Sequence, residues 1–140
     1  MRSLILHANV FESKIMSKSD RLWGAEPEEN ITSPKRRMEE CLVILFCVEN
    51  KDTEQQLKLL YDEITHNAHD MKVSNIMMTP FAHLSREIAH PSTAKKMYLQ
   101  LLKWFESTPF TVDSSHFGYN KTFLLDIKGH CCAYKYREFT

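Results

Sequence analysis

The chain has 140 residues, of which 43% are apolar and 11% aromatic, and its 18 basic and 18 acidic side chains cancel. This length supports one hydrophobic core and is too short for two, so we expect a single domain over residues 1–140. The zero net charge excludes a protein that binds nucleic acid non-specifically through a general positive field. Any contact with RNA must therefore come from a local patch.

Cysteine usage and hydropathy indicate the compartment. No apolar run approaches the roughly 20 residues of a membrane span, and the amino terminus lacks the core of a signal peptide. Cys41 and Cys47 lie within one apolar run, whereas Cys131 and Cys132 are adjacent, and this arrangement suits a disulfide framework poorly. We therefore expect a reduced, cytoplasmic protein that does not bind membranes.

Apolar runs predict the strands. Leu4–His7 and Phe11–Met16 are typical of two paired strands, and residues 17–34 of a polar surface loop. Cys41–Val48 is the most apolar run, and its β-branched residues favour a central strand that is covered on both faces. Further strands are predicted at residues 73–78, 110–112, 121–128 and 131–139, with a turn at Gly129.

Two helices are predicted between these strands. The first is capped by Asp52 or Thr53 and extends to about His69, with apolar residues on one face at helical spacing. The second starts at Pro91 and has a similar apolar stripe. Two main helices among six or seven strands predict an α/β domain with a mixed β-sheet.

Two segments carry residues that suit a reactive pocket. Thr79–Ser85 is a loop at the carboxyl end of a predicted strand, where open α/β sheets bind ligands, and it contains His83. In Phe117–Lys121 a glycine permits a tight turn, and the ammonium of Lys121 suits a phosphate or a reacting water. The same patterns also fit a structural loop histidine and a turn that ends in a solvated lysine.

Three other clusters fit ordinary structural roles better than chemistry. His130–Cys132 contains metal-ligand residue types, but neighbours on a strand point to opposite faces, so we expect buried thiols there. His66 and His69 lack a third ligand, and Lys35–Arg37 suits a solvated surface as well as RNA phosphates. We therefore expect no metal site, and the absence of a Gly-rich phosphate loop argues against ATP use.

Several short motifs follow one another along the chain: Met1–His7, Arg37–Val43 with Val48–Glu49, Pro80–Ser85, Phe117–Lys121 and Lys128–His130. In this order, and with near-constant spacing from Met1 to about Arg137, they resemble the N-terminal editing domain of archaeal threonyl-tRNA synthetases. Pro80–Ser85 is the most distinctive of these motifs.

This resemblance implies a fold like that of D-aminoacyl-tRNA deacylases, commonly as a homodimer. It also implies hydrolysis of the ester that joins serine to the terminal adenosine of tRNA(Thr), with no cofactor. One methyl group distinguishes serine from threonine and supplies only about 1–3 kcal/mol of discrimination, so a second, hydrolytic site is needed. The implied partners are the 3′ end of tRNA(Thr) and a threonyl-tRNA synthetase catalytic core, in cis or in trans.

The resemblance further implies roles for single residues. Lys121 would stabilise the oxyanion that develops at the ester, and His83 would border the side chain of the amino acid. The other expected substrate-binding residues are Val48 and Ala82, through their backbones, and Pro80, Phe81, Phe117, Tyr119, Asn120 and Tyr134.

Asn120 and Tyr134 depart from the family pattern. Many members have an aromatic residue at the first position and, at the second, a glutamate that partners the catalytic lysine. Loss of that carboxylate favours a lower pKa and a looser side chain for Lys121. The alternatives are a D-aminoacyl-tRNA deacylase of relaxed specificity, or a degenerate domain that only binds tRNA or mediates dimerisation.

Overall fold

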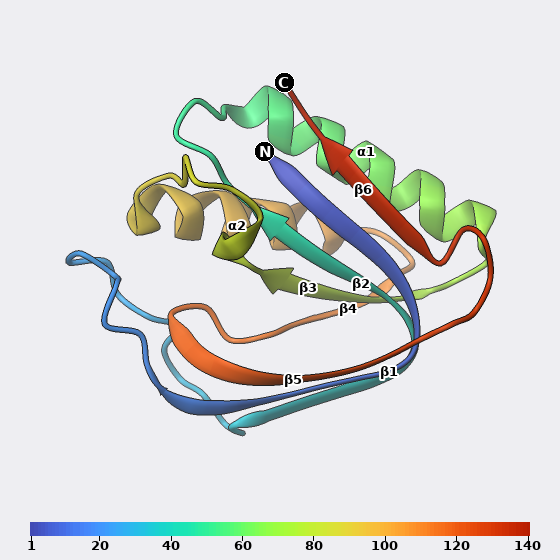
Figure 1. Ribbon diagram of the computed structural model, residues 1–140, viewed down its shortest axis with the longest axis horizontal. Helices are drawn as coiled ribbons and strands as arrows, with labels where there is room; N and C mark the ends of the chain where they lie inside the picture. The colour runs from blue at the N-terminus through green and yellow to red at the C-terminus, as the bar shows by residue number, and fades with distance from the viewer.

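The computed structural model describes residues 1–140 as a six-stranded mixed sheet with two main helices (Figure 1). The mixed α/β class predicted from the sequence is confirmed. The strands are β1 Arg2–Lys18, β2 Lys35–Cys47, β3 Asn75–Pro80, β4 Thr111–Ser114, β5 Tyr119–Ile127 and β6 Tyr134–Glu138. The helices are α1 Glu54–Asp70, α2 Pro91–Phe105 and the short 3₁₀ helix η1 Ala82–Leu84. No helix is long and apolar enough to cross a membrane.

The long strand β1 organises the sheet because both of its edges are paired. The antiparallel strand β2 follows one edge, while the other edge pairs with β6 over residues 2–6 and with β5 over residues 8–18. Beyond β2, strands β3 and β4 are added in parallel, so the order is β4-β3-β2-β1-β5. Strands β5 and β6 therefore lie one after the other along the same edge of β1.

The prediction of two paired strands at Leu4–His7 and Phe11–Met16 is wrong, because both belong to β1. The intervening residues contain neither glycine nor proline, so nothing turns the chain back. The pairing of β1 with β5 instead shifts register between Ala8 and Val10 and again between Ile15 and Ser17. Such irregularities bend a strand and increase its twist without ending it.

Both helices begin where local chemistry predicts. Thr53 caps α1: the N–H of Gln55 donates to Thr53 Oγ1 at 3.2 Å, and the N–H of Thr53 donates to Gln56 Oε1 at 2.8 Å. These reciprocal bonds satisfy backbone donors that the first turn of a helix leaves free. Helix α2 begins with Pro91, whose fixed φ suits a first helical position.

The two faces of the sheet carry separate hydrophobic cores. The helix-face core holds the buried residues of α1 and α2 against alternate residues of β2, such as Leu42 and Ile44. The opposite face curls over a smaller inner core formed by Leu6, Ala8, Phe11, Cys41, Val43, Leu45 and Met77. Phe81, just after β3, packs against Phe123 of β5 at 6.1 Å between ring centroids. Since β2 and β1 separate these strands in the sheet, this contact shows that the curl brings its edges together (Figure 1).

The last strand is shorter than predicted. Strand β6 begins at Tyr134, and Cys131 and Cys132 lie in the turn that precedes it. The expectation of buried thiols there is wrong, because both side chains are exposed, whereas Cys41 and Cys47 are buried as expected. A turn removes the strand alternation on which the prediction depended.

Candidate active site

The candidate site lies at the end of the inner core where β3 and β4 end and β5 begins. Parallel strands present their carboxyl ends at one edge of a sheet, which is where ligands bind in open α/β folds. The N–H of Ser115 donates to the carbonyl of Met78 at 2.9 Å and so joins the segment after β4 to β3. Phe123, two residues after Lys121 on the same face of β5, reaches Phe81 across this opening.

Lys121 is the cationic group of this opening. Its partly buried ammonium donates to the carbonyl oxygen of His116 and lies 3.5 Å from Ser115 Oγ. Burial lowers the pKa of Lys121 from the ordinary 10.5 to about 8, and the negative charge of Glu28 opposes this effect. A donor with a pKa near neutrality is suited to acid–base or oxyanion chemistry.

Glu28 supplies the acidic influence on Lys121, and it comes from the loop between β1 and β2. Its N–H donates to the carbonyl of Phe117 at 2.9 Å. The hydroxyl of Tyr98 donates to Glu28 Oε1 at 3.1 Å, and that of Tyr119 donates to the backbone carbonyl of Glu28 at 3.0 Å. These three bonds fix the loop against the segment that carries Lys121. Nothing in the sequence indicated this role, because only the fold brings residues 28 and 121 together.

Gly118 is required for this docking. Its φ is +87°, in the left-handed region that favours glycine, and an added Cβ would lie 2.7 Å from the Cα of Pro27. The expected tight turn at this glycine is therefore present, but it also permits a close backbone approach that the sequence pattern did not reveal.

Several polar groups close to the site are buried without hydrogen-bond partners. Ser13 Oγ and Thr79 Oγ1 both lie on fully buried residues, as do both ring nitrogens of His116. Burial, and secondarily the charge of Arg36, lowers the pKa of His116, so its imidazole is neutral at physiological pH. Unpartnered buried polar groups are rare in folded proteins, and strain, a catalytic role or a bound water each accounts for such groups. The sequence analysis included Thr79 in its candidate loop but did not single out Ser13 or His116.

The Pro80–Ser85 motif forms the neighbouring wall. Its backbone is held to β2, since the N–H of Phe81 donates to the carbonyl of Phe46 at 2.8 Å. Ala82 and His83 are exposed in η1, and the imidazole of His83 packs edge-on against Phe81 at 5.1 Å between centroids. His83 therefore stands at the rim of the opening rather than in the core.

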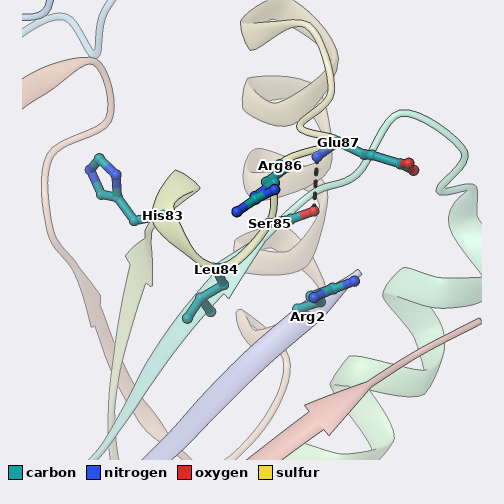
Figure 2. A pocket seen from close by; sticks show the side chains of 6 residues that line it. All are labelled: Arg2, His83, Leu84, Ser85, Arg86 and Glu87. Atoms are coloured by element: carbon teal, nitrogen blue, oxygen red, sulfur yellow. Dashed lines mark hydrogen bonds between the residues drawn. The ribbon is translucent and has the colours of Figure 1, made fainter.

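A shallow cavity of about 480 Å³ adjoins this wall, lined by Arg2, His83, Leu84, Ser85, Arg86 and Glu87. In Figure 2 the imidazole of His83 points away from the two arginines. Ser85 Oγ accepts from the N–H of Glu87 at 3.0 Å and donates to Glu49 at 2.6 Å, and Glu49 also pairs with Arg2 at 2.9 Å. Lys121 does not line this cavity, so the structure separates an arginine-lined hollow from the lysine.

Val48, Phe117 and Asn120, three of the expected substrate-binding residues, make contacts within the chain. The side chains of Val48 and Phe117 are buried in the helix-face core, where Phe117 stacks on Tyr98 at 5.8 Å. The carbonyl of Val48 already accepts from the N–H of Ala89 at 2.9 Å. Asn120 is exposed, and its amide donates to Ser17 at 3.1 Å. As the neighbour of Lys121 on a strand, Asn120 points to the opposite face.

Tyr134 does not occupy the position of a partner to Lys121. On β1, Tyr134 lies opposite Leu6, whereas Lys121 lies opposite Ile15 at the far end of the same edge. Tyr134 is 61% exposed. Within this chain Tyr134 and Lys121 therefore lie apart, because β5 and β6 pair with different parts of β1.

The other polar clusters form surface pairs. His66 lies 3.1 Å from Asp70, and the basic run after the loop pairs with Glu12, Glu39 and Asp113. No group of three or more His, Cys, Asp or Glu side chains is arranged to hold a metal ion.

Comparisons with known proteins agree with the resemblance seen in the motifs. A family model described as the archaea-specific editing domain of threonyl-tRNA synthetase matches residues 1–139. A threonine–tRNA ligase of Methanococcus aeolicus is 29% identical over 143 residues, covering 100% of this chain and 22% of that protein. One from Pyrococcus horikoshii is 32% identical over 136 residues, covering 95% of this chain and 21% of that protein.

The chain thus spans about a fifth of the length of the curated relatives that it matches. Among solved structures, the c-Myc DNA Unwinding Element Binding Protein has a TM-score of 0.72, with 99% of this chain and 98% of that chain covered. At 12% identity this likeness shows a shared fold alone. The match of the family model along residues 1–139 shows the family: the chain belongs to the archaea-specific editing domains of threonyl-tRNA synthetase, which deacylate tRNA(Thr) mischarged with serine.

Proposed function

We propose that this chain hydrolyses the ester between serine and the terminal adenosine of tRNA(Thr), with Lys121 as the group that stabilises the developing oxyanion. One observation supports the assignment of oxyanion stabilisation to Lys121. The ammonium of Lys121 lies at the carboxyl ends of β3 and β4, held by Ser115 and the carbonyl of His116. Preorganised donors aimed at developing negative charge commonly provide the largest part of enzymatic rate enhancement.

The protonated form of Lys121 fits this role. Attack of water on the ester places a negative charge on the carbonyl oxygen, and a neighbouring ammonium lowers the energy of that state. With a pKa of about 8, Lys121 is mostly protonated at neutral pH. Its two oxygen acceptors direct the ammonium without neutralising it. The reaction proposed here uses water and the chain's own residues, with no cofactor.

The Pro80–Ser85 wall fits the recognition of the amino acid. Phe81 and His83 form a rigid edge-on pair beside the opening, and the backbone of Ala82 is exposed there. We assign this wall to the serine side chain, with His83 at the place where an additional methyl group would collide. Such a hydrolytic site corrects the error that one methyl group permits in the synthetic site.

The arginine-lined cavity fits the RNA part of the substrate. Arg2 is held in place by Glu49, while Arg86 has no carboxylate within 4.0 Å. Guanidinium groups are well suited to phosphate because they offer several donors in a planar fork. We therefore assign this cavity to a backbone phosphate near the 3′ end of tRNA(Thr).

The assembly follows from the same proposal. The curled sheet with both helices packed on one face supports a D-aminoacyl-tRNA deacylase-like fold. The exposed side chains of Leu124, Tyr134 and Tyr136 along the β5 and β6 edge support a homodimer. A threonyl-tRNA synthetase catalytic core in cis or in trans would supply the mischarged tRNA, and such a reaction belongs in the cytoplasm.

The test is a comparison of three esters under identical conditions. Purified protein is mixed with seryl-tRNA(Thr), threonyl-tRNA(Thr) or a D-aminoacyl-tRNA, and the release of amino acid is followed against spontaneous hydrolysis. The proposal predicts rapid loss of serine and slow loss of threonine. Equal rates for the seryl and threonyl esters would overturn it, and preference for the D-aminoacyl ester would assign the chain to D-aminoacyl-tRNA deacylation. Binding of tRNA without turnover would indicate a degenerate domain.

A further inference from the structure

The turn between β5 and β6 presents two neighbouring thiols to solvent. Cys131 and Cys132 are both exposed, and their sulfur atoms lie 3.6 Å apart. Adjacent side chains on a strand point to opposite faces, but in this turn the side chains of Cys131 and Cys132 point toward each other. The chain therefore exposes a dithiol whose sulfurs are already in contact.

Hydrogen bonds hold this turn in one conformation. The N–H of Ala133 donates to the carbonyl of His130 at 3.1 Å, and the N–H of Cys132 donates to His130 Nδ1 at 3.2 Å. His130 Nδ1 is thus an acceptor, so the ring proton of a neutral His130 lies on Nε2, which is 2.8 Å from His7 Nδ1. The N–H of His7 also donates to the carbonyl of Ala133 at 2.9 Å. The turn is thereby tied to β1 through both backbone and side chains.

We propose that Cys131 and Cys132 form a thiol-redox site that low-molecular-weight disulfides convert reversibly into a disulfide between the two neighbouring residues. This inference goes beyond ester hydrolysis and does not depend on it, because the turn lies beside His7 in the middle of β1, whereas Lys121 pairs with Ile15 near the end of that strand. The ligand class is a small disulfide such as oxidised glutathione.

The reaction balances in two exchange steps. The thiolate of one cysteine attacks one sulfur of the oxidant, forms a mixed disulfide and releases one thiolate, which takes up a proton. The other cysteine then loses its proton, attacks the sulfur of the first cysteine and expels the second thiolate, which also takes up a proton. The two cysteine sulfurs lose two electrons and two protons in total, and the oxidant is reduced to two thiols.

The contact between the sulfurs couples the two thiols. The hydrogen bond with Cys131, together with the charge of that residue, raises the pKa of the Cys132 thiol. Because the sulfurs share this contact, either cysteine can act as the first nucleophile, and the other then closes the ring.

The product is reversible because of its geometry. Neighbouring Cα atoms are about 3.8 Å apart across a trans peptide, below the roughly 4.4–6.8 Å that relaxed disulfides span. Strained, exposed disulfides are the ones that thiols reduce readily. The remaining cysteines do not compete, since burial raises the pKa of Cys41 to about 12 and that of Cys47 to about 11.

The experiment counts thiols in the intact chain. Protein is incubated with graded oxidised glutathione, unfolded, alkylated with iodoacetamide and weighed by mass spectrometry, with peptide mapping of the product. We expect loss of two of the four alkylatable thiols, a monomeric product that carries two carbamidomethyl groups in place of four, and a link between Cys131 and Cys132. Reduced glutathione is expected to restore all four thiols.

Two variants separate this reaction from general oxidation. Cys131→Ser and Cys132→Ser change exposed side chains, and each is expected to accumulate a mixed disulfide without an internal bond. A trivalent arsenical, phenylarsine oxide, is expected to bind the native chain at least tenfold more tightly than either variant. Four free thiols after oxidation, a link that involves Cys41 or Cys47, only intermolecular dimers, or equal arsenical binding by the variants would overturn the proposal.

Discussion

The two cores on either side of the sheet differ in completeness. The helix-face core joins both helices to the sheet through 20 buried apolar residues. The inner core has seven, and its open end is bordered by Lys121 and by buried polar groups without partners, such as Thr79 and Ser13. The core on the helix face is therefore apolar, whereas the core on the other face is bordered by polar and charged groups.

This difference separates stability from function. Burial of apolar surface supplies most of the free energy of folding, so the helix-face core is expected to determine stability. Unpartnered polar groups and a lysine with a lowered pKa oppose folding, and proteins retain such groups at functional sites. Substitutions in the helix-face core should therefore lower the free energy of unfolding, whereas substitutions at the polar side should change the rate of deacylation.

The largest expected effect is the loss of catalysis in Lys121→Met. Removal of an oxyanion-stabilising donor lowers the rate of hydrolysis by about 10²–10³-fold. Stability should be maintained or increased: folding lowers the pKa of Lys121, so below about pH 8 the buried ammonium destabilises the folded state. Single-turnover deacylation of seryl-tRNA(Thr) and thermal unfolding measure the two effects. The exposed Lys14, on the neighbouring strand, provides the matched control Lys14→Met, and equal losses in both variants would contradict the account.

The reverse pattern is expected for Leu60→Ala in α1. Leu60 is fully buried in the helix-face core, and its truncation should lower the free energy of unfolding by about 2–5 kcal/mol. Deacylation by the protein that remains folded should be unchanged. Urea unfolding provides the measurement, and the neighbouring Leu59, which is 41% exposed, provides the control Leu59→Ala. A strong loss of the rate constant in the folded Leu60→Ala protein would show that the two sides are not separable.

Gly118→Ala should affect both measurements, because this glycine joins the loop to the site. We expect a loss of about 1–3 kcal/mol in stability from strain and overpacking, together with slower deacylation as the loop that carries Glu28 moves away. Two glycines separate the causes: Gly24→Ala introduces only the positive φ, and Gly129→Ala introduces neither strain nor collision. If urea unfolding gives the same free energy of unfolding for Gly118→Ala and Gly129→Ala, the proposed close approach between Gly118 and Pro27 is excluded.

The smallest effect is expected for Tyr134→Glu. This variant restores the carboxylate that many family members carry. Within one copy of the chain, however, residue 134 lies opposite Leu6 of β1, whereas Lys121 lies opposite Ile15. The rate constant and its pH dependence should stay as in the native protein. A clear gain in deacylation, measured beside the native chain, would mean that residue 134 reaches the lysine in the functional assembly.

Local chemistry predicted the elements whose signals are local. The cap of α1, the start of α2 at Pro91 and the apolar run of β2 were found because nearby residues determine them. The continuity of β1 was missed because bulges leave no clear mark in the sequence, and the exposure of Cys131 was missed because a turn was mistaken for a strand.

The site shows the same limit. Lys121 and the Pro80–Ser85 motif were identified by their resemblance to a family, and Phe81 of the motif packs against Phe123, two residues after Lys121. Glu28 and His116 were missed, since their importance depends on a loop that docks from a distant part of the chain. The ring of Phe117 packs on Tyr98 in the helix-face core, and its position next to the turn does not reveal this in the sequence.

The pH dependence of deacylation tests the central claim most directly. The single-turnover rate constant for seryl-tRNA(Thr) is measured from about pH 6.5 to about pH 9.5 and corrected for spontaneous hydrolysis. If the ammonium of Lys121 stabilises the oxyanion, the corrected rate falls as the pH rises through about 8. The fall should begin at lower pH in Glu28→Gln, because the charge of Glu28 raises the pKa of Lys121. A corrected rate constant that rises with pH over the same range, or that does not change with pH, would contradict the account.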